Sequence, residues 1–239
     1  MAGTITRLWR RLARWFVSGL AVLFAGFALY QGWFLVHIVY WVKHNPDTTS
    51  VMDTRLAALR KTSPQARLQH RWVDYGRTSV HLKRAIVAAE DGKFLDHEGF
   101  DWEGIQRALE KNRRRGKVVA GGSTITQQLA KNLFLTGERS LVRKGQEAII
   151  TAMLEAVMDK RRILEIYLNI AEWGEGVFGA DAAARHYFGV SAAAVTAGQA
   201  ARLAAMLPRP RFYERNRESR YLAQYADTIA ARMPAAQVP

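Results

Sequence analysis

The sequence predicts a mainly α-helical domain preceded by one transmembrane helix. The first observation is a run without any charged residue, from Trp15 to Val42, in which apolar residues dominate. The second is that, from His81 onward, apolar residues recur at helical spacing between residues that favour helix ends. No segment has a clear strand pattern, and there is no internal repeat. We therefore expect a basic tail over residues 1–14, the spanning helix over 15–42, a connector over 43–80 and the functional domain over 81–239.

Composition narrows the class of protein. The chain of 239 residues is long enough, beyond its anchor, for one domain with a sizeable core. The formal net charge of +14 fits a nucleic acid, an anionic lipid surface or a substrate that carries phosphate. The absence of cysteine excludes disulfides, thiolate catalysis and cysteine zinc sites. The histidines lack the spacing of metal ligands, and there is neither a Walker loop nor a nucleic-acid module. We expect no metal site and no nucleic-acid partner.

The uncharged run is long enough to cross a bilayer. As a helix, Trp15–Val42 spans about 42 Å, against about 30 Å for the hydrocarbon core. Four arginines precede the run, at positions 7, 10, 11 and 14, while Lys43 and Asp47 follow it. The positive-inside rule then places the N-terminus in the cytoplasm and the rest outside. The alternative is a cleaved signal peptide, which the length of the run disfavours, because such apolar cores are about 7–15 residues long.

The elements of the remaining chain follow from caps and apolar faces. The first three expected are a short helix near Met52–Arg60, a helix with Leu82, Ile86 and Ala89 on one face that ends at Glu90, and a helix capped by Asp101 with Trp102, Ile105 and Leu109 on one face. Next come a helix begun by the capping box Thr124–Gln127 with Ile125, Leu129 and Leu133 aligned and a stop at Gly137, and a helix capped by Ser140 that buries Ala148, Ala152 and Leu154 or their neighbours. The last are a helix capped by Asp159 with Ile163, Tyr167 and Ile170 inward, a helix begun at Ser191 and Thr196 and stopped by Pro208, and a final helix over Tyr221–Arg232.

Glu90 is the first candidate catalytic residue. A carboxylate at the C-terminal end of a helix faces the negative end of the helix dipole, and burial removes its hydration. Both effects raise its pKa, and the neighbouring Asp91 adds to them, which suits general acid–base work. The alternative is that Glu90 and Asp91 form an ordinary solvated helix end.

Glu147 is the second candidate. It follows Arg143 by four residues and Lys144 by three, so all three share one helix face. If that face packs toward Glu90, two carboxylates stand among cations, as in enzymes of glycosyl chemistry. The alternative is a surface ion pair.

Basic residues on successive helical segments form the third constellation. They are Lys131, Arg139, Arg143, Lys144 and Lys160. A pyrophosphate leaving group gains charge as its bond breaks, and fixed cations would stabilise it. The alternative is that these are the ordinary basic faces of a basic protein. We expect Lys111–Lys117 to be an exposed loop that contacts membrane phosphates, with solubility as the alternative role.

A glycine turn precedes the helix that begins at Thr124. Gly121 and Gly122 allow close approach of a ligand to the backbone. Ser123 and the amide-rich helix that follows strengthen this interpretation, because they offer hydroxyl and amide groups to an anionic or sugar ligand.

Five segments together resemble the peptidoglycan glycosyltransferases (glycosyltransferase family 51), and most closely their monofunctional biosynthetic transglycosylases. They are AEDGKFLDHEGFD (89–101), GGSTITQQLAKNLFL (121–135), RKGQE (143–147), KRRILEIYLNIAEWG (160–174) and GVFGADAAARHYFG (176–189). The resemblance covers roughly residues 82–207, and five motifs in this order are highly specific. The segment after Pro210 matches the last motif of the family only loosely, so Arg215, Arg217 and Arg220 receive no role.

The resemblance implies a lysozyme-like, mostly helical fold with a membrane-touching second lobe. It implies polymerisation of lipid II: the growing chain on undecaprenyl pyrophosphate is the donor, the 4-hydroxyl of another lipid II is the acceptor, and the anomeric configuration inverts to give a β-1,4 glycan. It also implies a bacterial inner membrane, a periplasmic catalytic domain and cell-division or wall-synthesis proteins as partners. The family is often assisted by a divalent cation, Mg²⁺ or Mn²⁺, although the sequence shows no dedicated ligand set for one.

The resemblance also assigns roles to residues. Glu90 matches the general base, and Glu147 matches the second carboxylate. Lys131 and Arg139 match contacts to the donor pyrophosphate, with Arg143, Lys144 and Lys160 nearby. Ser123 and Gln128 match residues that position the substrate. No Ser-x-x-Lys or Lys-Thr-Gly motif occurs, so we expect no transpeptidase activity.

Two rival functions remain open from the sequence. One is a lytic enzyme that cleaves the same polymer with a single glutamate, which the cation set disfavours because a hydrolase has no pyrophosphate to hold. The other is an anchored, non-catalytic module that binds anionic lipid and recruits division proteins.

Overall fold

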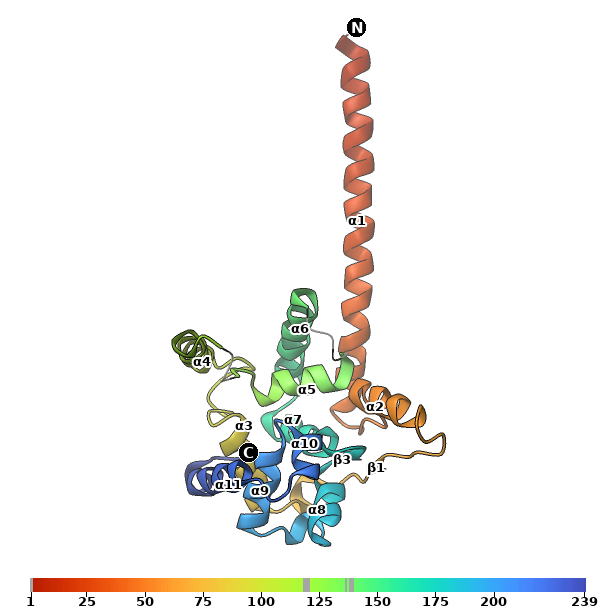
Figure 1. Ribbon diagram of the computed structural model, residues 1–239. Helices are drawn as coiled ribbons and strands as arrows, with labels where there is room; N and C mark the ends of the chain where they lie inside the picture. Colours follow the sequence, from red (N-terminus) through yellow and green to blue (C-terminus); the bar gives the residue numbers. More distant parts are fainter. Residues whose placement is uncertain (1, 118–120, 136, 138–139) are drawn as a thin grey trace.

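One long helix projects from a helical body. The structure is a computed structural model that describes residues 2–117, 121–135, 137 and 140–239. Helix α1 (Ala2–Trp41) extends away from the body over most of its length (Figure 1). Its apolar part, Leu12–Trp41, is the one helix of the described chain long and apolar enough to cross a membrane. The structure is therefore consistent with the single N-terminal membrane helix expected from the sequence.

The body is mainly α-helical, as predicted. Its helices are α2 (Ser50–Arg60), α3 (Val80–Glu90), α4 (Trp102–Arg115), α5 (Ile125–Phe134), α6 (Leu141–Val157), α7 (Lys160–Ile170), α8 (Ala180–Phe188), α9 (Ala197–Met206), α10 (Pro210–Arg215) and α11 (Arg220–Arg232). Short 3-10 turns cover Tyr75–Arg77, Ala192–Ala194 and Met233–Ala235. Neither α8 nor α10 was predicted from the sequence, because neither has a side-chain cap at its start and α10 is only six residues long.

The predicted caps begin their helices. Thr124 and Gln127 form the capping box of α5, and the side chains of Asp101, Ser140 and Asp159 accept hydrogen bonds from the first turns of α4, α6 and α7. A second capping box, Thr196 with Gln199, begins α9. Ser191 does not begin that helix, contrary to expectation, but precedes the separate 3-10 turn at Ala192–Ala194.

The expectation of no strand is wrong. Strands β1 (Gln69–His70), β2 (Glu172–Gly174) and β3 (Val177–Phe178) form a sheet in the order β1-β3-β2. β1 pairs in parallel with β3, and β2 pairs with it antiparallel. Strands of two or three residues cannot show an alternating pattern, and the β1–β3 pairing joins segments far apart in the sequence, so the tertiary fold decides them.

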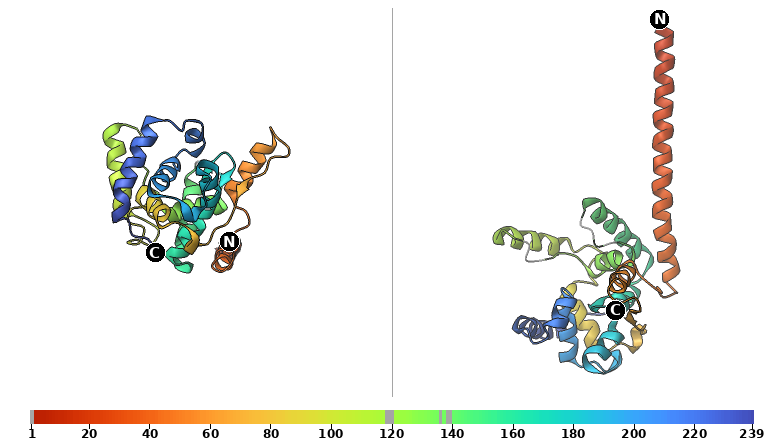
Figure 2. Two further views of the ribbon diagram at one scale, coloured as in Figure 1. Left: turned by 90° about the horizontal axis from the view of Figure 1, so that it is seen from below. Right: turned by 45° about the vertical axis from the view of Figure 1, so that its right-hand side comes forward.

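Helix α4 differs from its prediction in two respects. Trp102 and Leu109 are exposed rather than packed, and Ala108 is the buried residue of this helix. The basic segment expected to be a loop is helical as far as Arg115, and Gly116 then ends the helix in a left-handed conformation. Figures 1 and 2 show that α4 stands out from the body, on the side toward which α1 extends. Helix α6 also differs in one detail, since Ala152 is exposed and Leu154 is buried.

The base of α1 is attached to the helices that carry the candidate site. Phe34 and Ile38 are buried at this base, and Phe134 at the end of α5 packs edge-on against the ring of Phe34. Gln31 exchanges two side-chain hydrogen bonds with Gln146 of α6, at 2.8 and 2.9 Å. Arg162 of α7 donates to the carbonyl oxygen of Trp41, at 2.9 Å. The base of α1 is therefore fixed to α5, α6 and α7.

A glycine permits the sheet to pack against the end of α7. Gly179 has φ +87° and ψ 154°, a conformation that is nearly restricted to glycine. A Cβ atom there would lie 2.6 Å from the carbonyl oxygen of Asn169. Asn169 in turn binds the backbone of Val73 through both ends of its side-chain amide, at 2.8 and 2.9 Å. The close approach at Gly179 thus connects α7, β3 and the segment before α3.

We expect Gly179→Ala to lower the free energy of unfolding by about 3 kcal/mol or more, because strain and a backbone clash add. Gly189 is the matched control, since it also has a positive φ, +69°, but a Cβ there would meet nothing within 4 Å. Gly189→Ala should cost about 1 kcal/mol. Denaturant unfolding in detergent measures both, and equal losses would contradict the role given to Gly179.

Candidate active site

Glu90 is the last residue of α3, as predicted, and its side chain lines a cavity. One carboxylate oxygen, Oε2, accepts a hydrogen bond of 2.7 Å from Nε2 of Gln128 on α5. Burial raises the pKa of Glu90, and Asp91 raises it further, whereas the Gln128 hydrogen bond and the charge of Lys131 lower it. The net shift is upward. A carboxyl with a raised pKa is suited to accept a proton.

A buried phenol fixes the orientation of Gln128. The hydroxyl of Tyr167 on α7 donates to Oε1 of Gln128 at 2.9 Å, so the amide nitrogen must face Glu90. Burial raises the pKa of Tyr167 far above its usual value, and the Glu90 charge adds to this, so the phenol remains a donor. Tyr167 was predicted only as a core residue. The signal that could have identified it is the usual need of a buried tyrosine hydroxyl for a partner.

Asp91 holds the end of α3 against the start of α5. Its Oδ2 accepts from the backbone nitrogen of Ile125 at 3.0 Å, and its Oδ1 contacts Nε2 of His97 at 2.9 Å. Asp91 is buried, so these two bonds supply the partners that its carboxylate needs away from water. His97 thus fixes the loop that follows α3 by its hydrogen bond to Asp91.

Lys160 lies beneath this loop. Its ammonium donates to the carbonyl oxygen of His97 at 2.6 Å and pairs with Glu155 at 2.8 Å. It is not among the lining residues of the two cavities next to Glu90 and Glu147. Lys160 therefore supports the loop that follows Glu90, whereas the other described candidates line a cavity.

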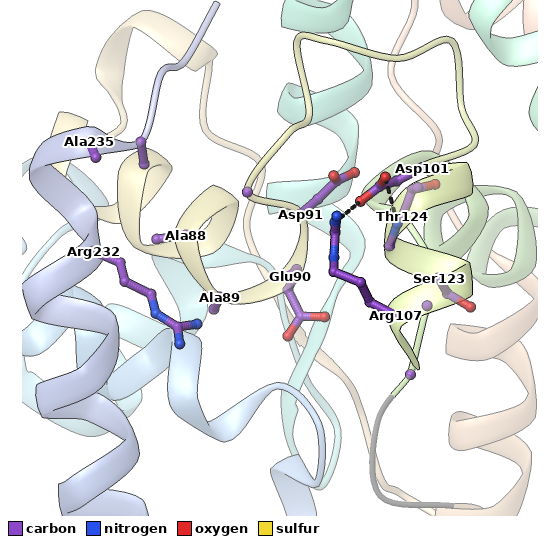
Figure 3. A pocket seen from close by; sticks show the side chains of 15 residues that line it. Ala88, Ala89, Glu90, Asp91, Asp101, Arg107, Ser123, Thr124, Arg232 and Ala235 are labelled. Carbon is purple, nitrogen blue, oxygen red and sulfur yellow. Dashed lines mark hydrogen bonds and ion pairs between the residues drawn. The ribbon is translucent and has the colours of Figure 1, made fainter. Parts of the chain in front are cut away.

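Two cavities meet at Ser123. The Glu90 cavity has a volume of about 490 Å³ and is drawn in Figure 3. The Glu147 cavity has a volume of about 360 Å³. Ser123 lines both. The remaining lining residues of the Glu147 cavity are Val51, Gln127, Gln128, Lys131, Leu135, Gly137, Arg143, Lys144 and Glu147. Sequence reasoning had singled out most of its polar members.

The Glu147 cavity concentrates positive charge around one buried carboxylate. Glu147 is 3% exposed, which excludes the surface ion pair left open from the sequence. Its Oε2 accepts from Arg143 at 2.9 Å, and its Oε1 accepts from the ammonium of Lys144. Lys131 enters from α5; burial lowers its pKa, and the nearby Glu147 charge opposes that shift. Three cations against one carboxylate leave an excess of positive charge, which suits an anionic ligand.

The structure thus unites most of the predicted residues, with two exceptions. Glu90, Ser123 and Gln128 lie at the junction of the cavities, and the Glu147 group lies in the second. Lys160 is set apart, and Arg139 lies outside the described residues. The described residues contain no group of three or more His, Asp or Glu side chains that could hold a metal ion.

This arrangement defines the class of protein: a helical protein with one long apolar N-terminal helix, a cavity lined by a carboxylate of raised pKa and an adjoining cationic cavity that suits an anionic ligand. The comparison with known proteins specifies it. Residues 56–234 match the Transglycosylase family model. Curated relatives named biosynthetic peptidoglycan transglycosylase include one from Laribacter hongkongensis (strain HLHK9), 60% identical over 95% of this chain and 100% of the relative. Another, from Azoarcus sp. (strain BH72), is 57% identical over 96% and 99%.

The chain therefore belongs to the transglycosylase family and is a peptidoglycan glycosyltransferase. A third relative with the same name, from Methylobacillus flagellatus, is 58% identical over 94% of this chain and 98% of its own length. The family expected from the five motifs is confirmed.

We expect Glu90→Gln to stabilise the fold at pH 7. A carboxyl whose pKa is raised by folding binds more protons in the folded state, so wild-type stability falls as pH rises from the unfolded pKa through the folded one. The Glu90→Gln variant does not lose stability in this way, because its side chain does not titrate. Its amide still offers an oxygen to the Gln128 amide nitrogen. The gain should be about 1.4 kcal/mol for each unit of pKa elevation and should vanish toward pH 4. Unfolding free energies measured across pH check this; a variant less stable at pH 7 would contradict it.

Proposed function

We propose that this enzyme polymerises lipid II into β-1,4-linked glycan strands and releases undecaprenyl pyrophosphate. The observation that carries the proposal is the junction at Ser123, where a carboxylate with a raised pKa adjoins a cavity rich in cations. A glycosyl transfer from a lipid diphosphate needs both parts: a base for the attacking hydroxyl, and positive charge for the departing diphosphate.

In the proposed mechanism, Glu90 acts as general base. Its Oε2 accepts from Gln128, so Oε1 is the oxygen that takes the proton from the acceptor 4-hydroxyl. The hydroxyl oxygen forms a bond with the anomeric carbon of the donor while the bond from that carbon to the diphosphate oxygen breaks. A single displacement of this kind inverts the anomeric configuration.

The donor diphosphate is assigned to the Glu147 cavity. Lys131, Arg143 and Lys144 would stabilise the charge that develops on the leaving oxygen. Glu147 would act by holding Arg143 and Lys144 in place, as their hydrogen bonds to it support. Ser123, between the cavities, would contact the donor sugar. By resemblance, Arg139 joins the diphosphate contacts, and the Lys160 ammonium acts through the loop that it supports.

We propose that a divalent cation, Mg²⁺ or Mn²⁺, would assist the reaction by binding to the substrate rather than to the protein. The described residues offer no cluster of acidic and histidine ligands, so the cation would be held by the diphosphate oxygens. The chain's own lysines and arginines would neutralise the remaining charge. Loss of rate on addition of EDTA would support a role for the divalent cation in the reaction.

Helix α1 is proposed to be a single-pass anchor in the bacterial inner membrane, with the N-terminus cytoplasmic and the catalytic domain periplasmic. Support comes from its apolar span and from the arginines that precede it. The anchor would keep the site beside a lipid-linked substrate.

We also propose that the enzyme has no transpeptidase activity. We propose further that it works with cell-division or wall-synthesis proteins, which cross-linking in whole cells would identify.

We expect Glu90→Gln to abolish most polymerisation of lipid II, with a fall of about three to four decades in rate, because the general base is lost. The measurement is the yield of long glycan strands from purified enzyme and lipid II. Glu98→Gln is the matched control, since Glu98 is exposed on the same loop and should leave the rate unchanged. Shortening of preformed glycan without polymerisation by the wild type would favour a hydrolase, and full activity of Glu90→Gln would refute the mechanism.

We expect Gln128→Met to shift the acid limb of the pH–rate profile to higher pH. The Gln128 hydrogen bond lowers the pKa of Glu90, so its removal raises that pKa, and a higher pH is needed to form the carboxylate. The polymerisation rate measured from acid to neutral pH gives the limb. A drop in rate with an unmoved limb would mean that Gln128 acts on the substrate alone.

A further inference from the structure

The wall of the Glu90 cavity carries a cation that neither the motifs nor the proposed mechanism uses. Arg232 is the last residue of α11 and lines this cavity with Glu90. In Figure 3, Arg232 and Arg107 enter from opposite sides of Glu90. The remaining lining residues are Ala88, Ala89, Asp91, Gly92, Asp101, Gly104, Gly121, Gly122, Ser123, Thr124, Ala235 and Ala236.

The other charged groups of this wall are already engaged. Asp91 binds His97 and the backbone of Ile125. Arg107 pairs with Asp101 at 3.4 Å and with Glu103 at 3.3 Å. Arg232, in contrast, makes no hydrogen bond or ion pair with any residue that the structure describes, and its side chain is exposed. Its guanidinium therefore faces the cavity with five donors, none of which is hydrogen-bonded to a described residue.

The position of Arg232 is set by its buried neighbours. Ile229, one turn earlier, and Met233, directly after it, are both buried in the core. The 3-10 turn Met233–Ala235 packs back on α3, the helix that ends at Glu90. The backbone at Arg232 is thus fixed relative to the general base, while the charged end of the side chain stays in the cavity. A guanidinium on a fixed backbone is suited to bind a carboxylate or a phosphate through two parallel hydrogen bonds.

The direction in which α1 extends indicates whether Arg232 binds a carboxylate or a phosphate of the acceptor. Helix α4, which carries Arg107, lies on the side toward which α1 extends, and α11 lies on the far side (Figures 1 and 2). An acceptor tethered to the bilayer has its diphosphate nearest the membrane, and its sugars and peptide farther out. Arg232 therefore stands where the peptide-bearing part of the acceptor must lie when the sugar hydroxyl reaches Glu90.

We propose that Arg232 is a substrate-positioning residue that binds a free carboxylate of the peptide stem on the acceptor. This inference rests on the proposed function, because it assumes that the acceptor occupies the Glu90 cavity. The pairing orients the acceptor sugar by holding its peptide, and Arg232 takes no part in proton transfer. Its loss should affect acceptor binding rather than the chemical step.

The experiment compares four enzymes on two substrates. The enzymes are the full-length wild type, Arg232→Gln, Arg232→Lys and the control Arg220→Gln, in which an exposed arginine at the start of the same helix, outside the Glu90 cavity, is changed. The substrates are lipid II and lipid II whose peptide carboxyl groups are converted to amides. Polymerisation kinetics give KM and kcat for each pair.

With lipid II, Arg232→Gln should raise KM about 5- to 20-fold with kcat nearly unchanged, because one charge-assisted pair is lost. Arg232→Lys should be intermediate, and Arg220→Gln should match the wild type. With the amidated substrate, the wild type and Arg232→Gln should share the same raised KM. An unchanged KM of Arg232→Gln with lipid II would overturn the inference. So would a KM with the amidated substrate that is higher for Arg232→Gln than for the wild type by the same factor as with lipid II. Failure of the wild type to polymerise lipid II would instead refute the proposed function.

Discussion

The junction between the end of α3 and the start of α5 organises the site, and the buried carboxylate of Asp91 holds it. Asp91 binds the first backbone nitrogen of α5 and the ring of His97, so the residue before it, Glu90, cannot turn away from α5. Gln128, one turn into α5, then reaches the Glu90 carboxylate, and Tyr167 from α7 fixes the Gln128 amide. Three helices distant in sequence are thereby joined through one continuous set of hydrogen bonds.

The two carboxylates of the site have different surroundings. Burial raises the pKa of Glu90, and the single amide donor, Gln128, lowers it by less, so the pKa remains raised. Glu147 is also buried, but Arg143 and Lys144 both bind it directly. A buried carboxylate that is fully paired with cations is a structural and electrostatic element, whereas one with a free oxygen and a raised pKa is suited to proton transfer. The separation of roles follows from the partners that each helix supplies.

The membrane helix belongs to this framework. Its base packs on Phe134 of α5 and exchanges hydrogen bonds between Gln31 and Gln146 of α6, the residue directly before Glu147. The base of α1 and the cationic cavity are thus connected through α5 and α6. Arg232, the last residue of α11, lies on the wall of the neighbouring Glu90 cavity.

The sequence by itself determined most of the helices and caps, the apolar N-terminal segment and the family, and it singled out both glutamates, because these depend on local spacing and on motifs of contiguous residues. It identified Gln128, Lys131, Arg143 and Lys144, but not what each one touches. Only the tertiary structure decided the three short strands, the exposure of Trp102 and Leu109, the contacts of Lys160 and Tyr167 and the place of Arg232 on the wall of the Glu90 cavity. Each of these depends on which segments meet in space, and packing between segments distant in sequence leaves no periodic signal along the chain.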